Sequence, residues 1–167
     1  PLAIPSYIAA LAVVAFLGPK GMLQGWLEPL GVDRLPEVYG FWGAAFTLTC
    51  AGYPYVYLVV RAALASADTA EEEASRSLGV SPLRTFFAIA LPGLVPALAA
   101  GILLSVLYTL SDFGAVSLLN YSTFTRDIFI EYQSSFDRTG AAVLGAILGL
   151  VTLLILTSEL GVRSWLA

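Results

Sequence analysis

The hydrophobic and polar residues of this chain are segregated into four long apolar runs with polar intervals between them. The runs that contain no Asp, Glu, Lys or Arg cover residues 1–19, 38–60, 85–111 and 139–158. About 20 consecutive apolar residues are enough to cross a bilayer as a helix. We therefore predict four membrane spans, at about 2–17, 40–63, 87–110 and 140–156.

The backbone of a membrane span has to satisfy its own hydrogen bonds, because hydrocarbon supplies no partners. A helix does this within one segment, whereas the alternation of polar and apolar residues that a barrel strand requires is absent. The predicted fold class is therefore all-α, a polytopic membrane helical bundle. We read the whole chain, 1–167, as part of one transmembrane domain and, since it starts at Pro1, as a piece of a longer chain.

Two features modify this picture of straight spans. Pro54 lies inside the second span and should kink it, because proline has no backbone N–H to donate. The connector between the first two spans contains an apolar segment at 22–30, which we expect to form a short helix on the membrane surface.

The composition narrows the range of functions. The chain is 58% apolar and only 12% charged, with a mean hydropathy of +0.83, whereas soluble domains are nearer a quarter charged. It has no His and a single Cys, Cys50, so it cannot build a His/Cys metal site or an internal disulfide. A net charge of −4 provides no basic surface for nucleic acid. We expect no metal site, no cofactor and no nucleic-acid partner.

The basic residues do not determine the orientation in the membrane. If the interval between the second and third spans is cytoplasmic, its side carries Arg61, Arg76, Arg84 and Arg163. The opposite side carries Lys20, Arg34, Arg126 and Arg138. Four positive charges on each side leave the positive-inside rule without a preference.

The interval at about 65–90 has more local structure than a passive connector needs. Asp68, followed three residues later by Glu71, is typical of a capping box at a helix start. Gly79 lies where a C′ glycine would end that helix, and Ser81 with Pro82 would cap and open a second one. We predict a helix–turn–helix that leads directly into the third span.

This predicted helix pair has the features of a docking surface. Ala70, Ala74 and Leu78 recur every four residues and form one apolar stripe on the first helix. Three consecutive carboxylates, at 71–73, flank the stripe in the first turns, where the helix dipole favours them. A small-residue stripe with carboxylates beside it fits a groove that has basic walls.

The same interval resembles a known motif. Its spacing, from Leu64 to Glu73-Ala74-Ser75 and onward to Leu91-Pro92, resembles the EAA loop of permease subunits in binding-protein-dependent ABC importers. Ser75 replaces the commoner second alanine. The residues that the resemblance assigns to ATPase coupling are Glu73, Ala74, Ser75, Gly79, Phe86, Leu91 and Pro92.

The resemblance implies an orientation and a set of partners. The loop would face the cytoplasm and insert into a groove of a separate ATPase subunit, which acts as a dimer and hydrolyses the ATP, so the chain itself would not be an enzyme. The chain would be a multi-pass protein of the bacterial cytoplasmic (inner) membrane. A second permease half and a periplasmic or extracellular solute-binding protein would complete the importer, which works by alternating access.

A second resemblance concerns the cargo. Pro5-Ser6-Tyr7, the residues 54–57, the residues 111–114 and the residues 133–138 look like segments of ferric iron permeases, in which this chain would be most of the first of two fused halves. Thiamine and spermidine/putrescine permeases share the general plan and stay open as alternatives. Two further alternatives are a secondary transporter, although none of the ionisable groups that ion coupling needs lies at mid-membrane, and a membrane scaffold that docks a soluble partner.

The interval 111–138 forms the predicted outer loop, where we expect the binding protein to dock. Its segment 125–136 should be helical and cap or line the mouth of a path. Asp112 at the start of this loop is a candidate for the translocation path or an outer gate, together with Tyr108 and Ser111. Asp112 is equally well explained as an interfacial carboxylate or a helix-end cap, because a buried carboxylate needs a role or a partner.

Overall fold

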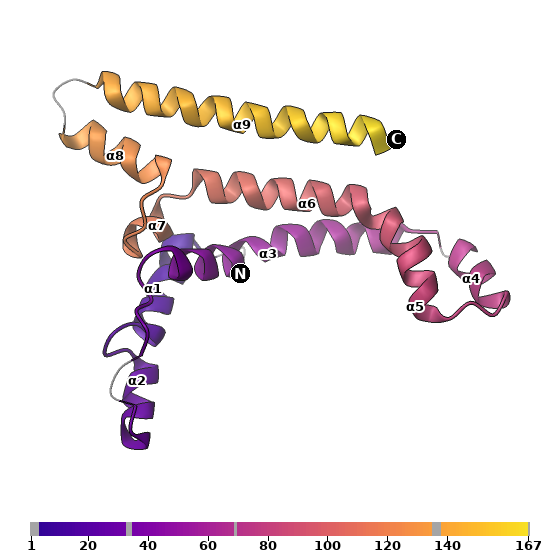
Figure 1. Ribbon diagram of the computed structural model, residues 1–167, viewed down its shortest axis with the longest axis horizontal. Helices are drawn as coiled ribbons and strands as arrows, with labels where there is room; N and C mark the ends of the chain where they lie inside the picture. Colours follow the sequence, from indigo (N-terminus) through magenta and orange to yellow (C-terminus); the bar gives the residue numbers. More distant parts are fainter. Residues whose placement is uncertain (1–3, 33–34, 69, 135–137, 167) are drawn as a thin grey trace. The chain divides into compact units, whose positions relative to one another are not determined.

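The computed structural model describes residues 4–32, 35–68, 70–134 and 138–166, and all regular elements in this part are helical (Figure 1). The helices in chain order are α1 (Ser6–Leu17), α2 (Met22–Leu27), η1 (Glu28–Leu30), α3 (Phe41–Ser66), α4 (Ala70–Ser77), α5 (Pro82–Thr85), η2 (Phe86–Ala90), α6 (Leu91–Ser111), α7 (Gly114–Leu118), α8 (Phe124–Ser134) and α9 (Thr139–Leu166). The predicted all-α fold class is confirmed.

Four helical segments of the described chain are long and apolar enough to cross a membrane. They are Ser6–Leu30, Phe41–Ser66, Pro82–Ser111 and Thr139–Glu159. Each overlaps one predicted span. The first is longer than expected, because α2 and η1 follow α1 end to end (Figure 1) and add further apolar turns after it. The segment 22–30 is helical as predicted, and its position on the membrane surface stays a prediction.

Several predicted features fall on residues outside the described part of the chain. Residues 2 and 3 of the first predicted span, Arg34, and residues 135–137 of the outer loop belong to this group, as does the side chain of Arg163. The helix predicted at 125–136 corresponds to α8, which starts one residue earlier and ends at Ser134.

The chain divides into two compact units. The first comprises Pro1–Tyr53 and Leu107–Leu154, and the second comprises Pro54–Val106 and Ile155–Ala167. The division runs through three long helices, α3, α6 and α9. In α3 it falls directly before Pro54, the residue at which we predicted a kink, although the helix continues through it to Ser66.

The core of the first unit is built from α1, α3 and α7. Its buried side chains are small or branched and come from all three helices: Ala10, Ala44, Leu48, Ala115, Val116 and Leu119. A Cβ added to Gly114 would lie 2.8 Å from the Cβ of Tyr7, so α7 touches the first turn of α1 through a bare backbone. The Gly40 N–H donates a 2.6 Å hydrogen bond to the Leu119 carbonyl, which joins the approach to α3 to the end of α7.

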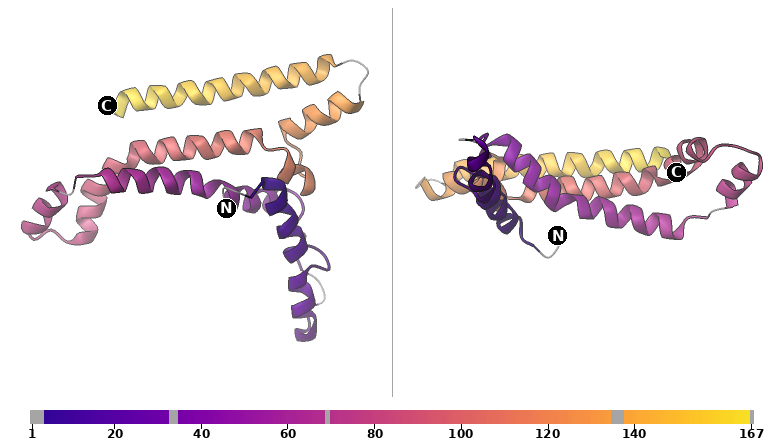
Figure 2. Two further views of the ribbon diagram at one scale, coloured as in Figure 1. Left: turned by 180° about the vertical axis from the view of Figure 1, so that it is seen from behind. Right: turned by 90° about the horizontal axis from the view of Figure 1, so that it is seen from below.

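In the second unit, the later part of α3 and the earlier part of α6 run side by side (Figures 1 and 2). A Cβ added to Gly101 would lie 2.8 Å from the Val56 Cα, so the two helices are in backbone contact at this point. Small residues permit such close packing between membrane helices, where dispersion replaces the hydrophobic effect as the driving force. The helices α4 and α5 form a hairpin beyond the end of α3.

A π-helical turn, η2, connects α5 to α6. The Leu91 N–H bonds the Phe86 carbonyl, five residues back rather than four. Pro92 explains the wider turn, because it offers no N–H to the Ala88 carbonyl and its ring would crowd that carbonyl in an α-helix. We predicted that the second helix leads directly into the span here, and the π turn was not predicted.

Candidate coupling site

The first helix of the predicted coupling loop, α4, begins as the sequence indicates. The Ala70 N–H donates a 2.9 Å hydrogen bond to Oδ1 of Asp68, so Asp68 caps the first turn. Glu71, Glu72 and Glu73 occupy that turn. Arg76 lies 4.0 Å from Glu72 along the exposed side of α4, and such a solvent-exposed pair contributes little to stability.

The turn after α4 is closed by backbone hydrogen bonds. Gly79 has a φ of +79°, in the left-handed region, and its N–H bonds the Arg76 carbonyl at 3.0 Å. The Val80 N–H reaches back to the Ser75 carbonyl at 3.2 Å. This pair of bonds is the Schellman motif, which requires a C′ residue that adopts positive φ without strain. The C′ role predicted for Gly79 is confirmed.

The start of α5 differs from the expectation in one respect. Ser81 occupies the N-cap position with Pro82 after it, and its carbonyl accepts the Thr85 N–H at 3.0 Å. Its hydroxyl forms no capping hydrogen bond, so the predicted side-chain cap is wrong. The fixed φ of Pro82 is sufficient to start this single turn.

A side-chain contact joins the two helices of the hairpin. The hydroxyls of Ser75 and Thr85 lie 3.0 Å apart, within hydrogen-bond distance, and Thr85 is only 1% exposed. Ser75 was predicted as a coupling residue from the motif that it shares with the EAA loop, whereas Thr85 was not predicted. Thr85 ends the short helix α5, and nothing in the local sequence distinguishes it from a surface threonine.

The remaining predicted coupling residues are spread over α4, η2 and α6. Glu73 and Ala74 are exposed on α4, Phe86 opens the π turn, and Leu91 with Pro92 begins α6. The turn itself presents apolar side chains to the outside, because Leu78 is 83% exposed and Leu83 is 74% exposed. We call these two leucines and Gly79 between them the hairpin tip.

The structure gives Asp112 a local partner. Its side chain is 7% exposed, and Oδ1 accepts the Ala115 N–H at 3.0 Å at the start of α7. The Thr125 hydroxyl donates a 2.6 Å hydrogen bond to the Asp112 carbonyl. Ser111 donates from its hydroxyl to the Tyr108 carbonyl at 2.9 Å, and Tyr108 packs against the core of the first unit. This geometry is that of the helix-end cap.

The end of α7 is closed by the same kind of turn as the end of α4. Asn120 has a φ of +54°, and its N–H bonds the Ser117 carbonyl at 3.2 Å. The Tyr121 N–H bonds the Val116 carbonyl at 2.9 Å. The first part of the predicted outer loop is therefore a folded element that belongs to the core. Farther along, the Arg138 guanidinium lies 4.5 Å from the ring centre of Tyr132 in α8.

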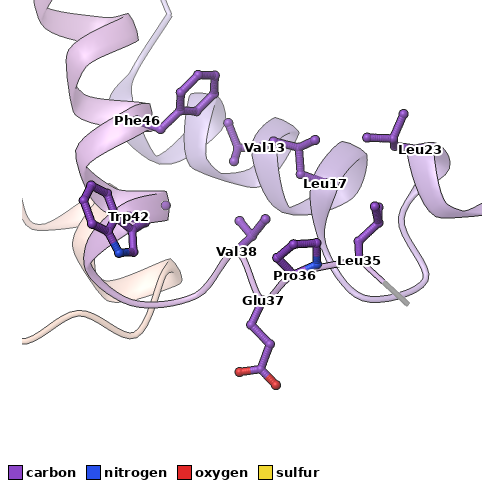
Figure 3. Close-up of a pocket in the computed structure, with 10 residues that line it drawn as sticks. Val13, Leu17, Leu23, Leu35, Pro36, Glu37, Val38, Trp42 and Phe46 are labelled. Carbon is purple, nitrogen blue, oxygen red and sulfur yellow. The ribbon is translucent and has the colours of Figure 1, made fainter. Parts of the chain in front are cut away.

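A separate groove of about 360 Å³ lies in the first unit (Figure 3). Its walls come from α1, α2, α3 and the segment 35–38, and the lining is almost wholly apolar: Val13, Leu17, Leu23, Leu35, Pro36, Glu37, Val38, Trp42, Gly43 and Phe46. The Glu37 carboxylate points away from the apolar side chains. Within the described chain, no three His, Cys, Asp or Glu side chains gather closely enough to hold a metal ion.

Comparison with known families accounts for this architecture. Residues 1–162 match the model of the binding-protein-dependent transport system inner membrane component. The chain belongs to this family, which confirms the resemblance drawn from the coupling loop, and it is a membrane protein of the inner-membrane type.

Both iron and sulfate transport permeases are among the proteins similar to this chain. The Fe(3+)-transport system permease protein FbpB 2 of Haemophilus influenzae is 46% identical over 123 residues, which cover 74% of this chain and 24% of that protein. A probable sulfate transport permease, cysT of Prototheca wickerhamii, is 30% identical over 93% of this chain and 62% of its own length. The sulfate permease CysT of Escherichia coli is 29% identical over 95% of this chain and 58% of its length.

A solved structure supports the fold. An inward-facing form of the MetNI methionine ABC transporter aligns with a TM-score of 0.70 and 19% identity, covering 99% of this chain and 70% of that one. The chain spans less than two thirds of the length of the iron and sulfate permeases to which it is similar.

Proposed function

We propose that this chain is part of a permease that couples ATP hydrolysis in a separate ATPase dimer to import across the inner membrane. The observation that carries the proposal is the hairpin between two spans, with an exposed apolar tip and carboxylates beside it. Neighbouring exposed apolar side chains outside the predicted spans are suited to contact with a protein partner. A groove in the ATPase with apolar floor and basic walls would complement them.

The helix after the tip supports a mechanical link. Residues Pro82–Ser111 form one helical run from the tip through the membrane span, so a push on α5 is transmitted along the axis of α6. When ATP closes the ATPase dimer, the hairpin would move with its groove and tilt the span. This is the alternating-access mechanism expected from the resemblance, with Glu73, Ala74, Ser75, Gly79, Phe86, Leu91 and Pro92 as the coupling residues.

The same proposal orients the chain. The hairpin faces the cytoplasm, and the segment 111–138 faces the opposite side, where a solute-binding protein docks and a second permease half completes the path. A cysteine introduced as Ser81→Cys, in a Cys50→Ala background, should react with an impermeant maleimide only when the cytoplasmic side is accessible. Labelling of intact cells from outside would overturn this topology.

Tyr108, Ser111 and Asp112 are proposed as parts of an outer gate. They lie together at the end of α6, and the Asp112 cap holds the first turn of α7 in the buried core. Release of α7 would therefore require this cap to break. Support for a gate comes from the location at the end of a span and from the low exposure of the carboxylate.

Ferric iron is the cargo that we propose, with sulfate as the second candidate. The iron permease is more similar to this chain, at 46% identity, than the sulfate permeases at 30% and 29%, although those match more of it. The outer segment 111–138 carries four carboxylates and two arginines, which favours a cation over a sulfate dianion at the mouth. Thiamine and polyamines are cationic cargoes that satisfy the same electrostatic argument.

Uptake of radioactive ferric iron by cells that carry the complete gene tests the proposal. The double variant Glu73→Ala with Gly79→Val should lose ATP-dependent uptake, whereas the matched double variant Ser77→Ala with Gly93→Val should keep it. Ser77 bonds its own helix, and Gly93 has no neighbour within 4 Å of an added Cβ. Equal uptake in both double variants would reject the coupling role.

The same assay separates the cargo from the mechanism. Absence of iron uptake in the unaltered strain, with the ATPase still copurifying with the permease, would retain the importer and reject iron. Uptake of radioactive sulfate would then be measured first, followed by thiamine and polyamines. Absence of any ATPase in the purified permease would favour the secondary transporter or the scaffold.

A further inference from the structure

The helices of the hairpin are held together with almost no apolar core. Between Ala70 and Ala90, the described side chains are exposed or half-buried, with the single exception of Thr85. Leu78 and Leu83, which would be the natural core residues of a helix pair, point into solvent at the tip. Hydrophobic burial therefore does little to fix α4 relative to α5.

The backbone turn alone does not fix the angle between α4 and α5 either. The Schellman bonds reverse the chain at Gly79. After the turn, however, Ser81 is extended, with φ −64° and ψ 147°, and the bonds of α5 start only at its carbonyl. Rotation about this extended residue would swing α5 against α4 without breaking a Schellman bond.

A partly buried polar contact supplies the missing constraint. The Ser75 and Thr85 hydroxyls lie 3.0 Å apart and join positions ten residues apart in the sequence. Thr85 is 1% exposed, so its hydroxyl has lost access to water and would be costly to leave unpaired. Because the hydroxyl group is short, the contact survives only over a narrow range of angles between the helices.

We propose that Ser75 and Thr85 are positioning residues, whose hydroxyl pair holds α4 and α5 at the angle that the partner recognises before the partner binds. This inference rests on the proposed coupling function. A preformed hairpin avoids the cost of ordering two helices during docking. It also transmits a push from the partner into α6 as one body, instead of losing it to rotation within the hairpin.

The variants separate the hydroxyl pair from simple packing. Thr85→Val keeps the branched shape and removes the hydroxyl, whereas Thr85→Ser keeps the hydroxyl. Ser77→Ala is the matched control, because the Ser77 hydroxyl lies on the same helix and donates at 2.7 Å to the Ala74 carbonyl of its own helix. The double variant Ser75→Ala with Thr85→Val removes both partners.

The first measurement is amide hydrogen exchange in the complete permease without the ATPase, which does not depend on the proposed function. Loss of one net hydrogen bond should speed exchange over residues 75–85 about fivefold in Thr85→Val. Thr85→Ser should restore the slow exchange, and Ser77→Ala should leave it unchanged. Unchanged exchange in Thr85→Val would overturn the constraint itself.

The second measurement is cargo transported per ATP hydrolysed, in proteoliposomes with the ATPase and binding protein. The ratio should fall in Thr85→Val and recover in Thr85→Ser, while the amount of bound ATPase stays the same. The double variant should be no worse than the single one, because both remove the same contact. Faster exchange with an unchanged ratio would reduce the pair to a structural role and overturn the positioning claim.

The two measurements also separate this inference from the proposed function. If the unaltered permease binds no ATPase, the coupling function fails, and the positioning role fails with it. The exchange data would still show whether the hydroxyl pair holds the hairpin.

Discussion

The same kind of turn occurs on both sides of α6 in the sequence, once before it at Gly79 and once after it at Asn120. The surroundings of the two turns are very different. At α7, the Schellman turn centred on Asn120 closes a helix with a buried face, on which Ala115 and the adjoining Leu119 are 0% exposed. At α4, the turn centred on Gly79 closes a helix whose neighbouring leucines are more than 70% exposed. Both turns have the same pattern of backbone hydrogen bonds, and they differ in how deeply the neighbouring side chains are buried.

This difference in burial indicates that the two regions obtain their stability from different sources. Complete burial of a leucine contributes about 1.5–3 kcal/mol. The α7 region has gained this contribution from α1 and α3 within its own unit. The hairpin leaves Leu78 and Leu83 unburied, so the same contribution is available to a partner. Substitutions should therefore act on stability in the first region and on assembly in the second.

The largest effect on stability is expected at Gly114. In Gly114→Ala, the new Cβ would overlap the Tyr7 Cβ and lower the free energy of unfolding by about 1–3 kcal/mol. The control Gly145→Ala meets nothing within 4 Å and should raise stability by about 0.5–1 kcal/mol, because alanine suits a helix interior better than glycine. Thermal unfolding of the complete permease in detergent measures both. Equal stabilities would contradict the close packing of α7 on α1.

Removal of the two aspartate caps, Asp112 and Asp68, should lower the free energy of unfolding by different amounts. Asp112→Ala removes a buried cap and should cost about 2 kcal/mol, while Asp68→Ala removes an exposed one and should cost about 0.5 kcal/mol, the two ends of the usual range. Denaturant unfolding of the two variants under one condition tests this order. The reversed order would mean that burial does not distinguish the two regions.

The variant Asp112→Asn tests whether the charge of Asp112 is needed for the proposed gate. It retains an oxygen acceptor for the Ala115 N–H and should alter the free energy of unfolding by less than about 0.5 kcal/mol. A loss of cargo uptake at unchanged stability would then report the charge. Unaltered uptake would leave Asp112 with its capping role alone.

Gly79→Val should have a moderate effect on stability and a strong effect on assembly. A side chain in the left-handed region costs about 1–2 kcal/mol, and the strain is confined to the hairpin. We expect the α1–α3–α7 core to keep its unfolding temperature while the ATPase no longer copurifies. Gly93→Val is the control in the same unit. Retained ATPase in Gly79→Val would show that the turn geometry is dispensable.

At Leu78, in contrast to Gly79, only a small effect on stability is expected. Leu78→Ser alters an exposed side chain and should shift the free energy of unfolding by less than about 0.5 kcal/mol. The amount of copurified ATPase should nevertheless fall, because an apolar contact with the partner is removed. A destabilised permease with normal ATPase content would mean that Leu78 packs within its own chain.

The spans and the hairpin were predictable from sequence because their signals are local. Span length follows from runs without charge, and the signals of Asp68 and Gly79 act within one or two turns. The docking of α7 was not predictable, since it depends on Gly114 meeting Tyr7 more than one hundred positions earlier. The Ser75–Thr85 contact likewise appears only after the chain reverses.

The π turn makes the rotational phase of the hairpin depend on a single residue. Each residue of an α-helix advances the chain by about 100° around its axis, and η2 holds one residue more than an α-helical turn closes over. Deleting one residue between Phe86 and Ala90 would therefore swing α5 by about that angle relative to the faces of α6. Shortening this turn would redirect the tip around the span, so the length of this five-residue segment sets the direction in which the tip would face the proposed ATPase partner.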